Sequence, residues 1–127
     1  MEDDRRCAIR WAIQLPVRYM GISRHIEGSC RTEDVSTTGA KLALVEKHVP
    51  GDRLNMVLDI PHSSGGSVCV EADVVWQREA CKSEEECNYM TGVAFRKIRD
   101  CHKRSILDFV STNFPQEFAR RWWEGLK

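Results

Sequence analysis

Apolar and polar residues alternate along much of the chain up to residue 97. The period of two is clearest from residue 54 to residue 60 and in the run Val68, Val70, Ala72, Val74 and Trp76. Such alternation is typical of a strand that buries one face. The pattern predicts strands over residues 11–20, 25–33, 40–46, 54–60, 68–76 and 89–97.

Turn-forming residues separate these predicted strands. Val49-Pro50-Gly51-Asp52 is a strong turn signal, and residues 61–66 have the Pro, Ser and Gly content of a hairpin loop. Residues 83–86, Ser-Glu-Glu-Glu, belong in a solvated connection. Short strands joined by turns favour a mainly β fold, either an antiparallel barrel or a sandwich.

The spacing of apolar residues changes to that of a helix after residue 100. Ile106, Val110 and Phe114 recur at every fourth position, and Asp100 is suited to cap the helix start. Pro115 ends this helix and can begin another. The sequence therefore predicts a helix after the strands and a second, amphipathic helix within residues 113–127.

The predicted second helix carries an apolar stripe of Phe118, Trp122 and Leu126, with Trp123 beside it. Exposed tryptophans are costly in water, so something should cover this stripe. Three surfaces could bury the stripe: the protein's own strands, a partner helix or second copy that would make a homodimer, and a membrane surface. The helix is short and sparsely basic, which disfavours the membrane.

Length and charge narrow the class of protein. The chain has 127 residues, about one domain, and carries 19 basic and 19 acidic residues. A neutral chain has no global field to attract nucleic acid or a membrane. The start, Met1-Glu2-Asp3-Asp4, is unlike a signal peptide, and no stretch is apolar enough to insert into a membrane. We expect a cytoplasmic protein.

The sequence contains six cysteines, at positions 7, 30, 69, 81, 87 and 101. None forms a Cys-x-x-Cys pair, and the spacing does not suit a zinc site. Without an export signal the expected compartment is reducing. We therefore expect free, mostly reduced thiols and no bound metal, and redox sensing stays open as an alternative.

Motifs of common enzyme classes are absent. The four histidines are scattered, and the Gly-x-Ser-x-Gly, His-Glu-x-x-His and Walker patterns do not occur. The sequence predicts a binding module with no catalytic residues and no cofactor.

Two polar segments carry the most specific chemistry. Arg5, Arg6 and Arg10 lie close together near the N-terminus, and Asp34-Val35-Ser36-Thr37-Thr38-Gly39 precedes a predicted strand. Arginine forks suit phosphate oxygens and the O6/N7 edge of guanine. A carboxylate such as Asp34 accepts hydrogen bonds from guanine's Watson–Crick edge. Gly39 permits a backbone with positive φ. Together these residues suit a ligand that is anionic and contains guanine.

The ordered pair Arg6-x-x-x-Arg10 and Asp34-x-Ser36-x-x-Gly39 resembles the signatures of the PilZ domain family, the bacterial receptors for cyclic di-GMP. Val74-Val75-Trp76 and Gly92-Val93-Ala94-Phe95 look like the family's late strands. The resemblance covers about residues 5 to 112, and no motif position is altered.

The resemblance implies a six-stranded antiparallel barrel with a C-terminal helix. It also implies that Arg6 and Arg10 grip phosphates and guanines, with Arg5 as an additional arginine. Asp34 and Ser36 would meet the ligand from the barrel face, and Gly39 would keep the backbone clear. Trp76 either presents its ring to the ligand or serves as a core or lid residue.

The expected organisation is an arginine-rich arm at residues 1–10, a barrel with its helix at 11–112 and the amphipathic helix at 113–127. The predicted function is a cyclic di-GMP effector of second-messenger signalling that acts on a downstream protein partner. Two alternatives remain: a small barrel that binds single-stranded RNA, and a protein-interaction module of the same fold without a ligand. The neutral charge and the acids beside Arg5 and Arg6 count against nucleic acid.

Overall fold

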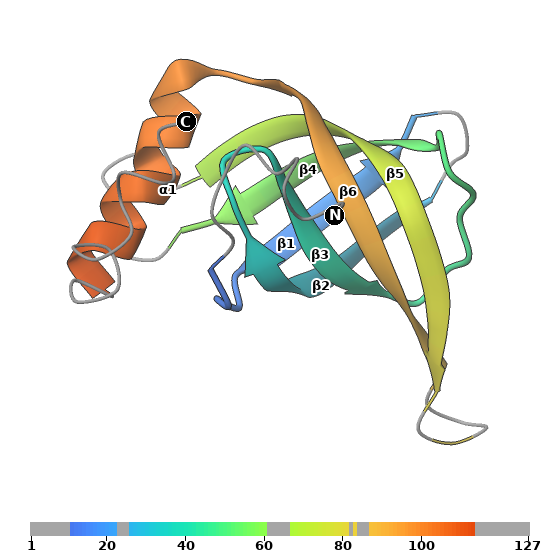
Figure 1. The fold of residues 1–127 in the computed structure, drawn as a ribbon. Helices are drawn as coiled ribbons and strands as arrows, with labels where there is room; N and C mark the ends of the chain where they lie inside the picture. The colour runs from blue at the N-terminus through green and yellow to red at the C-terminus, as the bar shows by residue number, and fades with distance from the viewer. Residues whose placement is uncertain (1–10, 23–25, 61–66, 82, 84–86, 114–127) are drawn as a thin grey trace, which may run out of the picture.

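Six antiparallel strands close into a barrel in the order β1-β2-β3-β6-β5-β4, and one helix follows them (Figure 1). This computed structural model describes residues 11–22, 26–60, 67–81, 83 and 87–113. The elements are β1 Pro16–Gly21, β2 Glu27–Val35, β3 Gly39–Leu44, β4 Arg53–Asp59, β5 Ser67–Cys81, β6 Cys87–Ile98 and α1 Asp100–Asn113. The predicted barrel with a following helix is confirmed. The predicted second helix lies outside the described residues.

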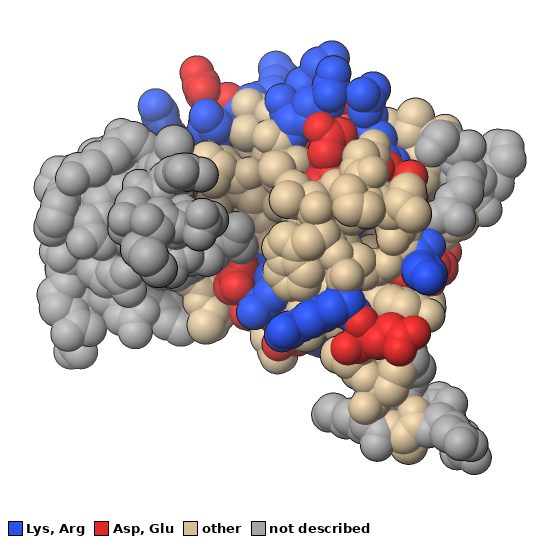
Figure 2. All heavy atoms as spheres, turned by 45° about the vertical axis from the view of Figure 1, so that its right-hand side comes forward, with Lys and Arg blue, Asp and Glu red and all other residues tan. Residues whose placement is uncertain are grey.

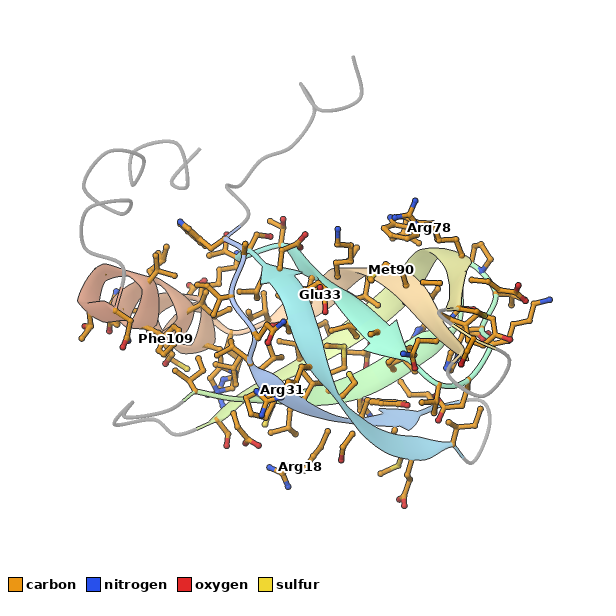
Figure 3. The ribbon with its side chains drawn as sticks, turned by 90° about the horizontal axis from the view of Figure 1, so that it is seen from below. Arg18, Arg31, Glu33, Arg78, Met90 and Phe109 are labelled. Carbon is orange, nitrogen blue, oxygen red and sulfur yellow. The ribbon has the colours of Figure 1, made fainter. Side chains whose placement is uncertain are left out.

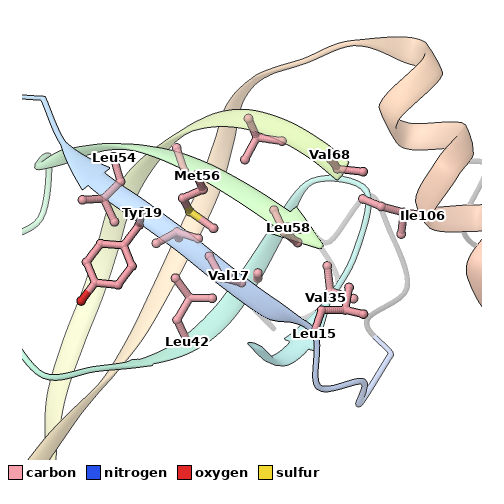
Figure 4. Close-up of a cluster of buried hydrophobic side chains, with 14 of the residues drawn as sticks. Leu15, Val17, Tyr19, Val35, Leu42, Leu54, Met56, Leu58, Val68 and Ile106 are labelled. Carbon is pink, nitrogen blue, oxygen red and sulfur yellow. The ribbon is translucent and has the colours of Figure 1, made fainter. Parts of the chain in front are cut away.

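The inward side chains of the strands form a single core (Figure 4). Leu54, Met56 and Leu58 of β4 are at most 1% exposed, as their alternation predicted. Burial of apolar side chains of this size is the main source of stability in such a fold. Ile106 and Val110 of α1 are also buried, and α1 lies at one end of the barrel (Figure 1).

The start of α1 differs from the prediction. The backbone N–H groups of His102 and Lys103 both donate to the carbonyl oxygen of Arg99. Arg99 therefore holds the capping position, and Asp100 is the first helical residue. A carboxylate in the first turn still interacts favourably with the helix dipole.

Residues 11–15 were predicted as the beginning of a strand, but β1 begins only at Pro16. Trp11, Ile13 and Leu15 nevertheless alternate inward and are buried. Thr32 replaces part of the missing strand ladder, because its Oγ1 accepts a hydrogen bond from the Leu15 N–H at 2.8 Å and donates to the Ile13 carbonyl. A side chain thus satisfies backbone groups that a ladder would otherwise pair.

The expectation of free thiols is wrong for Cys81, which is disulfide-bonded. Its partner in the β5–β6 register is Cys87, at the tip of the hairpin that these two strands form. Cys30, Cys69 and Cys101 are free. No Cys-x-x-Cys motif marks these positions, and the β5–β6 register places 81 and 87 opposite each other.

A partly buried polar cluster lies at the end of the core opposite α1, where Figure 4 shows Tyr19 far from Ile106. The Tyr19 hydroxyl donates to Glu46 Oε1 at 2.6 Å. Burial, and secondly the bond and negative charge of Glu46, raise the pKa of Tyr19 well above its ordinary value. Burial and the charge of Glu46 likewise raise the pKa of the Cys30 thiol to about 12.

Candidate functional site

The chain leaves the predicted arm at Trp11, whose position is tightly defined. Trp11 is 3% exposed, and its N–H donates to the Val35 carbonyl at 2.8 Å. The Val35 N–H donates back to the Trp11 carbonyl at 2.9 Å. The residue after Arg10 is therefore fixed directly beside Asp34 and Ser36. Arg5, Arg6 and Arg10 lie outside the described residues.

Ser36 organises the turn between β2 and β3. Its Oγ accepts hydrogen bonds from the N–H groups of Thr38 and Gly39, each at 3.1 Å. The Ser36 N–H donates to the Gly39 carbonyl at 2.8 Å. Ser36 itself is 1% exposed. Its hydroxyl therefore fixes the shape of the turn from within, as serine does in local side-chain turns.

Gly39 is needed for a reason other than the expected positive φ. Among the described glycines only Gly51 has a positive φ, of 97°. At Gly39 a Cβ atom would collide with the carbonyl oxygen of Val93 on β6. The glycine lets β3 and β6 approach closely just after the Ser36 turn.

The strand registers align four residues of the candidate site across the outside of the barrel. Asp34 of β2 lies opposite Lys41 of β3, Lys41 opposite Gly92 of β6, and Gly92 opposite Trp76 of β5. Lys41 Nζ lies 3.8 Å from Asp34 Oδ2. We call these four residues the outer row. It places the beginning of the Asp34–Gly39 motif and the predicted ligand-facing tryptophan on one surface.

Trp76 reaches this surface because of a bulge. The alternation in β5 predicted Trp76 in line with buried Val74, but the β5–β6 register shifts between these two residues. The extra residue turns Trp76 outward, where it is 39% exposed. Its indole lies against Gly92, at which a Cβ would collide with the ring nitrogen. A core role for Trp76 is thus wrong.

Arg78 completes the aromatic part of the site. Its guanidinium carbon lies 6.0 Å from the centroid of the Trp76 ring, within range of a cation–π interaction. Figure 3 shows Arg78 pointing away from the barrel on the side opposite Arg18. Sequence reasoning missed Arg78, although a residue two positions along a strand shares the face of Trp76. Lys41 and Gly92 were also missed, because only the registers bring them to Asp34.

The site combines a carboxylate, an exposed indole and two cations on adjoining strands. This set can accept donors, stack on a flat ring and bind an anion. Among the described residues no group of His, Cys, Asp and Glu could hold a metal ion. No helix in the described part of the chain is long and apolar enough to cross a membrane.

The family model "PilZ domain" matches residues 4–112. The solved PilZ domain of YcgR from Escherichia coli with c-di-GMP has a TM-score of 0.67 at 12% identity, covering 91% of this chain and 96% of that one. The inhibitor of motility MotI/DgrA of Bacillus subtilis has a TM-score of 0.69 at 17% identity, covering 89% and 53%.

The K. pneumonia MrkH–c-di-GMP complex gives a TM-score of 0.68 at 16% identity, covering 92% of this chain and 55% of MrkH. The chain thus spans about half the length of MrkH and of the Bacillus protein. At these identities the solved structures establish the fold alone. None of the curated proteins compared with the chain matches it.

Proposed function

Because the chain belongs to the PilZ domain family, we propose that it is a receptor domain for cyclic di-GMP. Two of the similar structures, of YcgR and MrkH, were solved with this ligand. The observation that carries the proposal is the outer row, in which Asp34 and Trp76 share one surface of the barrel. Trp11, which directly follows Arg10 in the sequence, is hydrogen-bonded to Val35, the residue after Asp34.

The arginines supply the anion-binding half of the site. Arg10 directly precedes anchored Trp11, and Arg6 lies five residues before it, a chain reach of at most about 17 Å. Their forks bind phosphate oxygens and the O6/N7 edge of guanine, and Arg5 adds a third cation. Chain length alone therefore allows both motif arginines to meet a ligand on the outer row.

The barrel supplies the base-reading half. Asp34 accepts hydrogen bonds from guanine N1–H and N2–H, displacing its long contact with Lys41. Trp76, with Arg78 beside it, stacks against a base. Ser36 and Gly39 act indirectly, because their hydrogen bonds and close packing hold the turn that follows Asp34.

In this role the protein is a non-enzymatic module that passes the ligand signal to a downstream protein in the bacterial cytoplasm. It binds the ligand and catalyses no reaction on it. Neither a metal nor a second cofactor takes part.

Calorimetric titration tests the proposal. Cyclic di-GMP should bind the full chain, and cyclic di-AMP should bind about a hundredfold more weakly, since adenine offers no N–H donors at N1 and C2. Asp34→Ala should narrow that difference. Asp59→Ala is the matched control, because Asp59 pairs with Arg18, an arginine that points to the opposite side of the barrel. Equal affinity for the two dinucleotides, or tighter binding of a single-stranded RNA, would overturn the assignment.

A further inference from the structure

A basic groove crosses β4, β5 and the end of β6 and reaches Thr37 and Thr38 of the turn that Ser36 organises. It encloses about 790 Å³ and is bordered by the outer side chains of β4 and β5, the end of β6 and the first turn of α1. Figure 2 shows Lys and Arg gathered along the top of the molecule, where Figure 1 places the end of β6. The lining contains four cations, Arg96, Lys97, Arg99 and Lys103, and one carboxylate, Glu71.

Three of these cations have no ionic partner among the residues that the structure describes. Arg96 is engaged, since it lies 3.5 Å from both Glu71 and Asp73. Lys97, Arg99 and Lys103 make no ion pair with any residue that the structure describes. They therefore remain available to a ligand from outside, while the Arg96 pairs hold the groove wall in place.

The shape of the surface favours an extended ligand. A second hollow of about 490 Å³ runs along β1 and the start of β2, and both hollows are lined by Asn55 and Val57. Met20, which lines the second hollow, is 48% exposed. Adjoining hollows with apolar side chains suit a chain of several residues better than a compact small molecule.

The charge pattern distinguishes a peptide from nucleic acid. Glu71 lies within the basic groove and Asp73 follows it on the same strand, so a row of phosphates would meet carboxylates. The chain as a whole is neutral. A segment with carboxylates between apolar side chains complements Lys97, Arg99 and Lys103, which line the same groove as Val57 and Cys69.

We propose that this basic groove binds an acidic, partly apolar segment of a partner protein, with Lys97, Arg99 and Lys103 contacting its carboxylates. None of these three cations belongs to the outer row, although the groove reaches Thr37 and Thr38 of the Asp34–Gly39 motif.

Selection from a displayed library of random peptides tests this, with the full chain as bait and no cyclic di-GMP present. Enriched peptides should carry Asp or Glu among apolar residues. Their affinity should fall about tenfold or more when Lys97, Arg99 and Lys103 are changed to Glu, and it should weaken with added salt. The matched control is Arg104→Glu, the same charge reversal at an exposed α1 residue that does not line the groove.

Thermal melts of each variant establish that it is folded before its binding is measured. Enrichment of peptides without acidic residues, no enrichment at all, or equal loss of binding in Arg104→Glu would refute the proposal. Tighter binding of a DNA or RNA oligonucleotide that depends on the same three cations would replace the peptide with nucleic acid, and so would also refute it.

Discussion

Trp11 and Val35 exchange both backbone hydrogen bonds, at 2.8 and 2.9 Å, although they are far apart in the sequence. This pairing joins the two signature segments: one ends next to Trp11, and the other surrounds Val35. The nearly complete burial of Trp11 makes the pairing part of the barrel core. The residue that follows the first motif is thereby held beside the second motif.

The first prediction concerns the motif arginines. Arg6→Ala and Arg10→Ala should each weaken cyclic di-GMP binding about tenfold to a hundredfold, because a charge-assisted bond to phosphate or guanine contributes about 1.5–3 kcal/mol. Arg6→Lys should also bind poorly, since an ammonium cannot form the fork. Calorimetry measures the affinities. Arg18→Ala, on the opposite side of the barrel, is the control and should bind normally; normal binding by both motif variants would contradict the model.

The second prediction concerns the stacking surface. Trp76→Ala should lower cyclic di-GMP affinity about tenfold or more, because stacking on an aromatic ring contributes about 1–3 kcal/mol per base. Gly92→Ala keeps the indole but forces it to move, since the added Cβ would meet its ring nitrogen. Both variants should therefore lose affinity. Quenching of tryptophan fluorescence by the ligand should be smaller in Trp76→Ala; unchanged affinity in both would exclude Trp76 from the site.

The strands and the core were predictable because one buried face leaves a period of two in the sequence. Leu54, Met56 and Leu58 follow it without interruption. The outward position of Trp76 was not predictable, because a bulge inserts one residue and leaves no mark in the alternation. The same limit applies to Cys81, whose disulfide no motif in the sequence marks.

Within the candidate site, sequence alone identified residue types but not their tasks. Asp34 and Trp76 were expected to face the ligand, and the registers put both on the outer row. Ser36 was expected to face it too, yet its hydroxyl is buried and bonded within its own turn. A serine that binds a ligand and a serine that closes a turn look identical in sequence.

The third prediction separates two glycines. Gly39→Ala should destabilise the fold by about 1–3 kcal/mol, because the new Cβ overlaps a backbone carbonyl that cannot move without disturbing the β3–β6 ladder. Gly51→Ala meets no atom within 4 Å and should cost only the strain of its positive φ, about 1 kcal/mol. Urea unfolding measures both. If Gly39→Ala lowered the free energy of unfolding less than Gly51→Ala, close packing of β3 against β6 would not be the reason for the glycine at position 39.

The fourth prediction concerns thiol reactivity. With a pKa of about 12, Cys30 should hold only about one thiolate in ten thousand at pH 8, and the thiolate is the reactive form. Cys69 and Cys101 are exposed and free. Brief alkylation with iodoacetamide followed by mass spectrometry should therefore label Cys69 and Cys101 first, and Cys30 only after unfolding. Early labelling of Cys30 in the folded protein would show that its thiol is accessible and ionises without unfolding.

The last prediction is a loss of stability in alkali that depends on Tyr19. Folding raises the pKa of Tyr19 through burial and the bond to Glu46, above the value of 10.0 expected for an unfolded chain. Between these two pKa values the unfolded chain releases the phenol proton and the folded protein retains it. The resulting stabilisation is complete below pH 10 and declines above it, by about 1.4 kcal/mol per pH unit.

Cys30 acts in the same direction from about pH 9, because its pKa is also raised, so wild-type stability alone does not isolate the tyrosine. Tyr19→Phe does. Its free energy of unfolding should be lower than that of the wild type at pH 8, since Glu46 loses a donor, and the difference should shrink as the pH rises from 10 to 11. Urea unfolding at each pH measures it. A difference that stays constant across this interval would show that Tyr19 ionises equally in both states.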